Sequence, residues 1–370
     1  MKTLPVGVQD LSHTFPVEWG LVMVAGVLIT ILAPVTFVGV QRHLVTGWGK
    51  GSTLGMTVQF GFSLQGRGIL AGREAITTLA KRAERLGYDS IWVTDRLLIP
   101  VQGTSANPYS PTGELPVGPD EPWLEPLTAV TYLATITERI NVGTSVLVIP
   151  YRNPVVTAKA LATADYLSGG RVILGAGVGW LREEFTALGI PFDDRGARTV
   201  EYLRIMKEIW TKPRVAFEGR FAHIAEAGGV RPHPAQQPHI PIWIGGHSEA
   251  ALKRVVEVGD GWHPLGLRPP VALYPPEMAA KVRRLREMAA AAGRDPAAIT
   301  IAFKGPVKFE EASGTRTPLA GSPAQIVEDL QAYVAAGVQH FVFDFSVATV
   351  PAMLDVLERF AGDVRPRVGP

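Results

Sequence analysis

Small residues end two apolar segments of the chain and could make room for a flat ligand. The segments are NVGTSVLVIP, which starts at Asn141, and RVILGAGVGW, which ends at Trp180. A parallel strand that is buried on both faces is a continuous apolar run, and ligands of barrel proteins bind where such strands end. We therefore expect a binding site at residues 145–148 and 175–180. For the glycine-rich stretch, a tight turn leading into a helix is the alternative.

A glycine pair before a helix-like segment could bind a phosphate. Residues 245–248, GGHS, would stand at a helix N-terminus, where free N–H groups and the positive end of the helix dipole attract anions. Ser248 could also cap that helix, which is compatible with phosphate binding. A dinucleotide-binding motif is disfavoured, because GAGVGW lacks the last glycine and the downstream acidic residue of that motif.

Composition excludes several kinds of chemistry. The chain has 370 residues, no cysteine and a formal net charge of +2. Without cysteine there is no disulfide, no thiolate nucleophile and no cysteine metal site. The near-neutral charge and the lack of a long basic run argue against nucleic-acid binding. We also expect no metal site and no serine-hydrolase chemistry, since neither ligand spacing nor a nucleophile elbow is present.

Eight apolar or β-branched segments must position these residues. The strands are expected to begin near Val58, Ser90, Ile140, Arg171, Pro241, Gly261, Thr300 and His340. They alternate with helix-like segments, of which residues 73–88 have an apolar face. Asn153 and Ser322, each followed by proline, predict two helix starts. Repeated strand-plus-helix units indicate an α/β fold, a (β/α)8 TIM barrel with insertions.

Two connections are longer than ordinary barrel loops. Residues 97–123 follow the second strand and are rich in proline, and residues 211–239 interrupt the barrel before the fifth strand. Long loops in compact domains are often lids over binding sites. We expect the first loop to be a lid on the substrate side, with a packing insert as the alternative.

The first 55 residues are expected to form a separate segment with one membrane span. Residues 20–40 have no charged side chain over a length that crosses a bilayer, and a buried helix of the globular domain is the alternative. Acidic residues precede this stretch and Arg42 and Lys50 follow it, so the positive-inside rule places the rest in the cytoplasm. We expect a cytoplasmic catalytic domain at 56–370, anchored to the membrane if residues 1–55 are translated.

The N-terminal segment resembles part of a transporter. Residues 15–52 are similar to the C-terminal end of a binding-protein-dependent sugar ABC transporter permease, in which a last span is followed by a Gln-Arg pair and a glycine-rich tail. The other spans of a permease are missing, so transport by this chain alone is not expected. The resemblance implies a gene overlap or a mistaken start codon, with Met56 as the natural start, or else a functional anchor.

The rest of the chain resembles the luciferase-like monooxygenase superfamily, in its coenzyme F-420-dependent oxidoreductase branch. The resemblance covers residues 56–367 and is carried by TDRLLIP, GTSVLVIPYRNP, GAGVGWLREEF, RGARTVEYL, PIWIGGHSEAALKRV and GDGWHP. It implies a bulge after the third strand, with a non-prolyl cis peptide near Ser145 and Val146, that backs the ring of the deazaflavin. The implied cofactor-binding residues are Ser145, Val146, Leu147, Gly177, Val178, Gly179, Gly245, Gly246, His247 and Ser248.

The resemblance also implies where the catalytic residues lie. Asp95 and Arg96 would face the ring, although the family commonly has Asp-His there and a guanidinium does not act as an acid or base. Arg96 is instead expected to bind an anionic or carbonyl group. Trp180 stands where the sugar-phosphate dehydrogenases have glutamate, so it is expected to wall an apolar substrate space or to pack in the core. His263 is the candidate proton donor, with a structural role as the alternative, and Glu183 and Glu184 are expected to stabilise the next helix.

The sequence therefore predicts an oxidoreductase that uses coenzyme F-420 (8-hydroxy-5-deazaflavin, F420 below). It would transfer hydride between C5 of the ring and an activated alkene, imine or carbonyl. The alternatives are an FMN-dependent monooxygenase, a non-catalytic cofactor-binding barrel and a membrane-tethered transporter accessory. The expected partners are a small-molecule substrate and no nucleic acid; a membrane tether through residues 20–40 and a homodimer are left open.

Overall fold

Eight parallel strands close into a barrel in the computed structural model. The structure describes residues 58–64, 66–101, 105–114, 117–228, 231–266, 270–310 and 316–369. The barrel strands are β1 (Gln59–Ser63), β2 (Ser90–Val93), β3 (Asn141–Thr144), β5 (Val172–Gly177), β8 (Ile242–Gly245), β9 (Gly261–His263), β10 (Thr300–Pro306) and β13 (His340–Asp344). They pair in the order β3-β2-β1-β13-β10-β9-β8-β5, and a β3–β5 pairing closes the ring. The predicted strands and the (β/α)8 class are confirmed.

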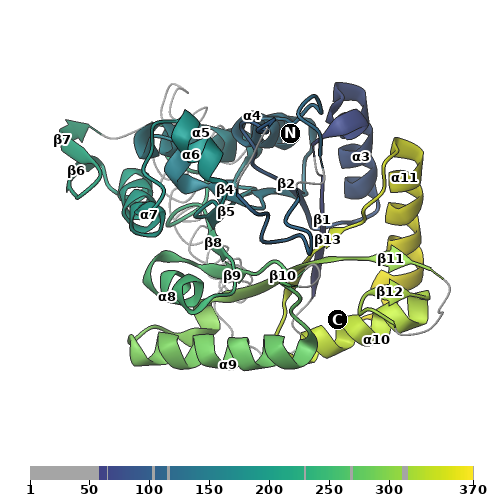
Figure 1. Ribbon diagram of the computed structural model, residues 1–370. Coiled ribbons are helices and arrows are strands. Elements are labelled where there is room, and N and C mark those ends of the chain that lie inside the picture. Colours follow the sequence, from purple (N-terminus) through teal and green to yellow (C-terminus); the bar gives the residue numbers. More distant parts are fainter. Residues whose placement is uncertain are drawn as a thin grey trace, which may run out of the picture. The chain divides into compact units, whose positions relative to one another are not determined.

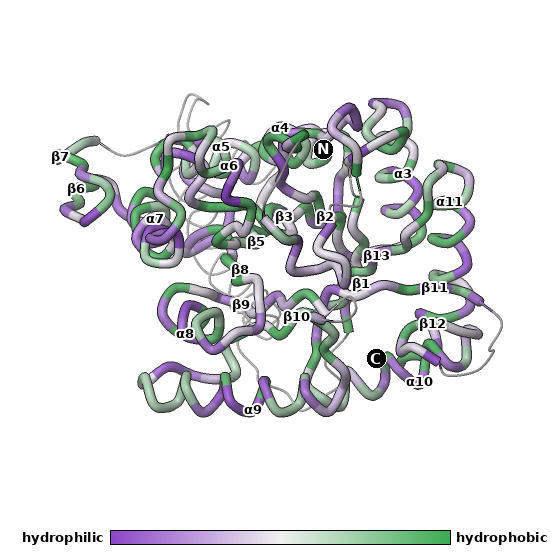
Figure 2. Tube along the Cα trace, viewed as in Figure 1, coloured by the Kyte–Doolittle hydropathy of each residue, from purple (hydrophilic) through white to green (hydrophobic). Residues whose placement is uncertain are grey.

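Helices cover the outside of the barrel (Figure 1). They are α3 (Arg73–Arg85), α4 (Pro126–Ile136), α5 (Pro154–Ser168), α6 (Arg182–Ala187), α7 (Arg195–Thr211), α8 (Glu249–Val258), α9 (Pro275–Ala291), α10 (Pro323–Ala335) and α11 (Val350–Arg359). Short helical turns occur at η1 (Gly68–Ala71), η2 (Ile149–Tyr151), η3 (Pro296–Ala298), η4 (Phe360–Val364) and η5 (Arg365–Arg367). Figure 2 shows hydrophilic and hydrophobic residues alternating along α9, whose buried residues follow the helical repeat.

The predicted helix caps are present. The side chain of Asn153 accepts hydrogen bonds from the N–H groups of Val155 and Val156 at the start of α5. Ser322 and Gln325 form a capping box at the start of α10. The helix expected at residues 73–88 ends earlier, at Arg85.

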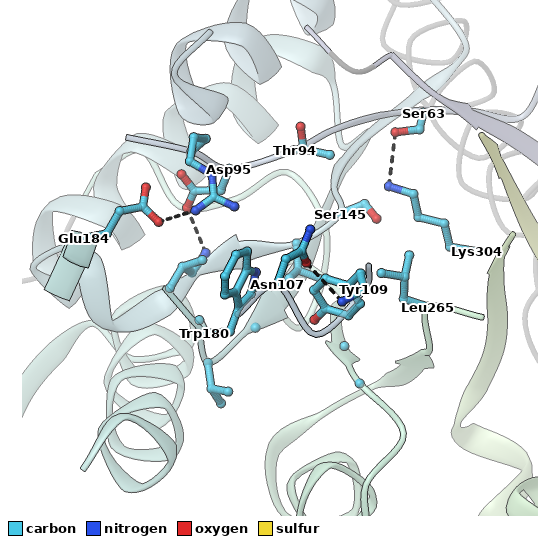
Figure 3. A pocket seen from close by; sticks show the side chains of 18 of the residues that line it. Ser63, Thr94, Asp95, Asn107, Tyr109, Ser145, Trp180, Glu184, Leu265 and Lys304 are labelled. Atoms are coloured by element: carbon cyan, nitrogen blue, oxygen red, sulfur yellow. Dashed lines mark hydrogen bonds and ion pairs between the residues drawn. The ribbon is translucent and has the colours of Figure 1, made fainter. Parts of the chain in front are cut away.

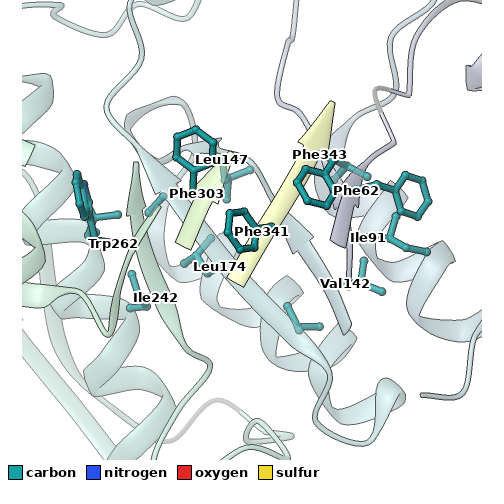
Figure 4. Close-up of a cluster of buried hydrophobic side chains, with 14 of the residues drawn as sticks. Phe62, Ile91, Val142, Leu147, Leu174, Ile242, Trp262, Phe303, Phe341 and Phe343 are labelled. Atoms are coloured by element: carbon teal, nitrogen blue, oxygen red, sulfur yellow. The ribbon is translucent and has the colours of Figure 1, made fainter. Parts of the chain in front are cut away.

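Strand side chains alternate between two cores. Those that point outward pack against the helices, among them Phe62, Ile91, Leu174, Phe303 and Phe341 (Figure 4). Those that point inward form a second cluster around Trp92 and Trp243, whose rings stack with centroids 5.2 Å apart. Glycines on neighbouring strands leave the room that the two indoles need. The middle of the barrel is therefore filled, and a ligand can enter only above the indoles.

Three small strand pairings interrupt the strand–helix alternation. The strand β4 (Leu147–Val148) continues β3 after a break and pairs with β5. The connection at 211–239 contains an antiparallel hairpin of β6 (Arg214–Glu218) and β7 (His223–Gly228), which the sequence did not predict. The short strands β11 (Lys308–Phe309) and β12 (Ala320–Gly321) pair in parallel.

The N-terminal predictions lie outside the described residues. This applies to the membrane span at 20–40 and to the permease-like segment at 15–52, which both stay predictions. Among the helices that the structure describes, none combines the length and the apolar character needed to cross a bilayer.

Candidate functional site at the carboxyl ends of the strands

A cavity of about 310 Å³ opens at the carboxyl ends of the barrel strands. Its lining comes from β1, β10 and β13, from the segments that follow β2, β3, β5 and β8, and from the loop at 97–123. Figure 3 shows Ser63 and Lys304 on one side of Ser145, and Trp180 and Glu184 on the other. Ligands of (β/α)8 barrels bind at this end of the strands.

The break between β3 and β4 places two of the three residues predicted there in the cavity. Ser145 and Val146 line it, and the peptide bond between them is cis, as the family resemblance implied. The side chain of Leu147 is fully buried in the outer core instead. Val148, the next residue of β4, lines the cavity again, so Leu147 and Val148 point to opposite faces of the strand.

The segment after β5 lines the cavity as predicted. Gly177, Val178, Gly179 and Trp180 all contribute to its wall. The reason for glycine at position 177 differs from the expected one. A Cβ atom there would collide with the side chain of Val146, so this glycine makes room for Val146 rather than directly for a ligand.

The GGHS segment divides between the cavity and the helix behind it. Gly245 and Gly246 line the cavity, and Gly246 has a φ of 86°, which favours glycine. His247 and Ser248 are absent from the lining that the structure describes. Ser248 is the N-cap of α8, where its side chain accepts from the N–H of Ala251, and the carbonyl of His247 accepts from Lys281 Nζ at 2.8 Å.

Asp95 lines the cavity, but its carboxylate is already hydrogen-bonded to other residues of the chain. Arg152 donates two hydrogen bonds to its carboxylate, at 2.6 and 2.9 Å, and the N–H of Val148 donates a third at 2.8 Å. Burial raises the pKa of Asp95, and the contacts with Arg152 and Val148 oppose that rise. Its visible role is to hold the segment after the break in β3.

Arg96 lies between two tryptophans and beside a carboxylate. Its guanidinium carbon is 5.9 Å from the ring centroid of Trp123 and 5.3 Å from that of Trp180, and its NH1 donates to Glu184 at 2.6 Å. The Nε of Arg96 and the Nε1 of Trp123 are buried and have no hydrogen-bond partner among the described atoms. Both residues line the cavity, so two N–H donors there are left for a ligand.

Glu184 is an anchor of the long loop, which corrects the sequence interpretation. Its carboxylate accepts from the N–H groups of Leu97 and Leu98 and from the hydroxyl of Tyr151, besides Arg96. Glu183 accepts from the N–H of Ser105 in the same loop. Both residues lie in the first turn of α6, as expected, but their carboxylates also accept hydrogen bonds from the backbone of the long loop.

The loop at 97–123 reaches the cavity, as a lid would. Asn107, Tyr109, Val117 and Trp123 from this loop line it. The ring of Tyr109 meets that of Trp180 edge to face, with centroids 6.5 Å apart. Trp180 therefore lies in the cavity wall, in the position expected for a wall of an apolar space.

His263 lies below the cavity rather than in its wall. The side chain is buried, stacks on Trp92 with centroids 4.9 Å apart, and its Nε2 is 2.9 Å from Ser145 Oγ. Burial and the nearby Lys304 lower the pKa of His263 well below its ordinary value. A neutral histidine that meets the cavity only through Ser145 is a positioning residue in this geometry.

The sequence interpretation missed Lys304 and its partner Ser63. Lys304 lines the cavity, is 4% exposed, and its Nζ donates to Ser63 Oγ at 3.2 Å. The signal was available, because IAFKGP places a lysine two residues after an inward-pointing alanine in an apolar strand. Within the described ranges, no group of three or more His, Asp or Glu side chains could hold a metal ion.

Comparisons with known proteins identify relatives of this chain. A family model described as Luciferase-like monooxygenase matches residues 54–314. An uncharacterized protein of Mycobacterium tuberculosis is 31% identical over 262 residues, which cover 69% of this chain and 89% of that protein. The F420-dependent glucose-6-phosphate dehydrogenase of Amycolatopsis mediterranei is 34% identical over 195 residues, 52% of this chain and 53% of that protein.

A solved structure shows the same fold. It is the coenzyme F420 dependent tetrahydromethanopterin reductase from Methanopyrus kandleri, with a TM-score of 0.66 and 19% identity over 84% of this chain and 99% of that one.

Proposed function

Since the chain belongs to the luciferase-like monooxygenase family and is an oxidoreductase, we propose that it binds coenzyme F420 and transfers hydride between C5 of the deazaflavin and a small organic substrate. The substrate would be an activated alkene, an imine or a carbonyl compound. The observation that carries the proposal is the cavity itself, which has a floor of backbone and small residues and walls of tryptophan and tyrosine.

The floor suits a planar ring. Ser145, Val146 and Gly177 to Gly179 form a surface with few protruding groups, and Trp123 and Trp180 enclose the space beside it. The free N–H groups of Arg96 Nε and Trp123 Nε1 offer donors to carbonyl oxygens of a ligand. A dry, shaped site of this kind fixes the geometry that hydride transfer requires.

The phosphate of the cofactor would bind near Gly246. The backbone there leads into α8, whose first N–H groups favour an anion. Two cations, Arg254 on α8 and Arg195, add positive potential near the same helix. Burial lowers the pKa of Arg254, and the positive charge of Arg195 lowers it further. The carboxylate of Glu249 in the first turn opposes an anion, but Arg284 pairs with it at 2.7 Å.

The cofactor supplies hydride chemistry when bound, because a deazaflavin has carbon where a flavin has N5. The protein then has to bind the ring, orient the substrate, exclude water and provide a proton. We propose a substrate other than a sugar phosphate, since the family resemblance places Trp180 where the sugar-phosphate dehydrogenases have glutamate, and Trp180 lines the cavity.

Titration of the full chain with coenzyme F420, and separately with FMN, tests this function. We expect quenching of cofactor fluorescence that saturates with coenzyme F420, and at least tenfold weaker binding of FMN. Tighter binding of FMN, with oxygen-dependent turnover, would favour the monooxygenase alternative. Binding of coenzyme F420 without hydride transfer to any carbonyl, alkene or imine in a substrate screen would favour a non-catalytic barrel.

Membrane attachment through residues 20–40 is a separate proposal, supported by the uncharged length of that stretch alone. Fractionation of cells that express the full chain tests it, with a chain starting at Met56 as the control. Recovery of both forms in the same soluble fraction would overturn it.

A further inference from the structure

Lys304 is a buried ammonium group that faces the cavity. On β10, Ile301 and Phe303 pack in the outer core, whereas Ala302 belongs to the inner cluster and Lys304 follows two residues later on the same face. The Nζ donates to Ser63 Oγ at 3.2 Å (Figure 3). The hydrogen bonds of the described residues thus use one of its three N–H groups, and the others are left for a ligand.

Three other titratable side chains of the cavity are engaged, whereas Tyr109 is a second candidate that the test below addresses. Asp95 accepts from Arg152 and Val148, and the hydroxyl of Tyr151 donates to Glu184. Glu184 accepts from two backbone N–H groups as well as from Arg96. A guanidinium such as that of Arg96 does not release its proton at the pH of the cell.

Burial favours release of the proton of Lys304, and the nearby carboxylate of Asp344 opposes that release. Asp344 on β13 attracts the ammonium charge, while His263 on β9 is neutral and buried, and burial lowers the pKa of Lys304 to about 8. Arg67 also lines the cavity. An acid whose pKa lies near the working pH is an effective general acid.

We propose that Lys304 is the proton donor of the reaction and that the substrate is a carbonyl compound whose oxygen lies at Nζ. This inference rests on the proposed function. The carbonyl carbon receives a hydride from the reduced deazaflavin, and the carbonyl oxygen receives a proton from Lys304. The C=O π bond is thereby replaced by one C–H and one O–H bond, the substrate gains two electrons, and the cofactor is left oxidised. The neutral amine regains its proton from water.

Three variants of the full chain test the role in turnover. Lys304→Met is expected to lower the rate of carbonyl reduction at least ~10²-fold, the usual size of a general-acid effect, with the Kd for coenzyme F420 within about threefold of wild type. Lys304→Arg retains the charge but not the transferable proton, so it should restore substrate binding without restoring the rate. Lys308→Met, which removes an exposed lysine outside the cavity, is the control.

The pH dependence gives a readout that a structural role would not change. Reduction needs the ammonium form, so its rate should fall above pH about 8, and alcohol oxidation, which needs the neutral amine, should rise there. Lys304→Arg should lose both dependences. Equal rates and pH profiles in wild type and Lys304→Met would overturn the proposal. Loss of the pH dependence in Tyr109→Phe instead would identify Tyr109 as the proton donor.

Amine labelling decides the matter without turnover. Acetic anhydride acylates neutral amines, so Lys304 of the cofactor-free chain should react with a midpoint near pH 8, and a bound ketone should protect it. Failure of Lys304 to react below pH 10, or no protection by any ketone, would contradict the proposal. Absence of coenzyme F420 binding would instead contradict the proposed function, which the labelling midpoint does not depend on.

Discussion

One methyl group of Val146, Cγ2, fills the space beside Gly177, so that a Cβ atom on residue 177 would collide with it. Both residues line the cavity, and the contact therefore fixes the height of its floor. Gly177 therefore shapes the floor indirectly, because it leaves room for the side chain of Val146.

Gly177→Ala should lift Val146 into the cavity. Overpacking of this kind costs about 1–3 kcal/mol, and if it falls on the bound state it weakens cofactor binding by roughly 10- to 100-fold. The Kd for coenzyme F420 measures the effect. Gly362→Ala, where a new Cβ meets no atom within 4 Å, is the control. The double variant Gly177→Ala/Val146→Ala should recover part of the affinity, and unchanged binding in the single variant would contradict this account of the floor.

Gly246 allows charge to be tested separately from backbone strain. Asparagine and aspartate both tolerate the positive φ of this position and have similar size, but only aspartate brings a negative charge. If the phosphate binds here, Gly246→Asp should weaken coenzyme F420 binding at least tenfold more than Gly246→Asn. Equal losses in the two variants, measured by the same fluorescence titration, would place the phosphate elsewhere.

Glu184→Gln should loosen the loop at residues 97–123. The buried carboxylate accepts hydrogen bonds from Leu97, Leu98, Tyr151 and Arg96, and an amide presents a donor to some of them. Removing one partner of a buried ion pair costs about 3–5 kcal/mol, so we expect a lower melting temperature and faster proteolysis within residues 97–123. The matched control is Glu257→Gln, which removes an exposed partner of Arg204. Wild-type proteolysis of the variant would show that other contacts hold the loop.

Stability should fall in mildly acidic solution because of His340. Burial lowers the pKa of this histidine to about 3 from its ordinary 6.5, while its ring contacts Ser90 and Gln59. The unfolded chain therefore binds the proton more readily, so the stabilisation is complete above pH 6.5 and is lost as the pH falls from there towards 3. His263 contributes with the same sign.

His340→Gln should reduce that pH dependence. The slope of the unfolding free energy against pH, from urea denaturation between pH 6.5 and 4.5, should be smaller than in wild type by up to ~1.4 kcal/mol per pH unit. An unchanged slope in His340→Gln would show that folding does not lower the pKa of this histidine.

Most of the fold could be predicted from the sequence because its signals are local. The apolar runs of β10 and β13, the cap at Asn153 and the capping box at Ser322 each depend on a few adjacent residues. The hairpin β6–β7 was missed because its strands are largely exposed, so they lack an apolar run.

The site was predicted only in part because it depends on register and depth. The break after β3 decides which of Ser145, Val146 and Leu147 face the cavity. The sequence does not show to which side of the strand each of these residues points. His263 ends its strand, yet the stagger of the barrel places it at the level of Trp92, below the cavity. Lys304 was missed because the sequence analysis used the segment that begins near Thr300 only as a barrel strand.

A crystal structure of the full chain with coenzyme F420 tests the central claim most directly. The account predicts density for the deazaflavin ring against Ser145 and Val146, between the floor at Gly177 to Gly179 and the indole of Trp123, with the phosphate at the N–H groups that follow Gly246. Density for the ring outside this cavity, or for the phosphate at a site remote from α8, would contradict it.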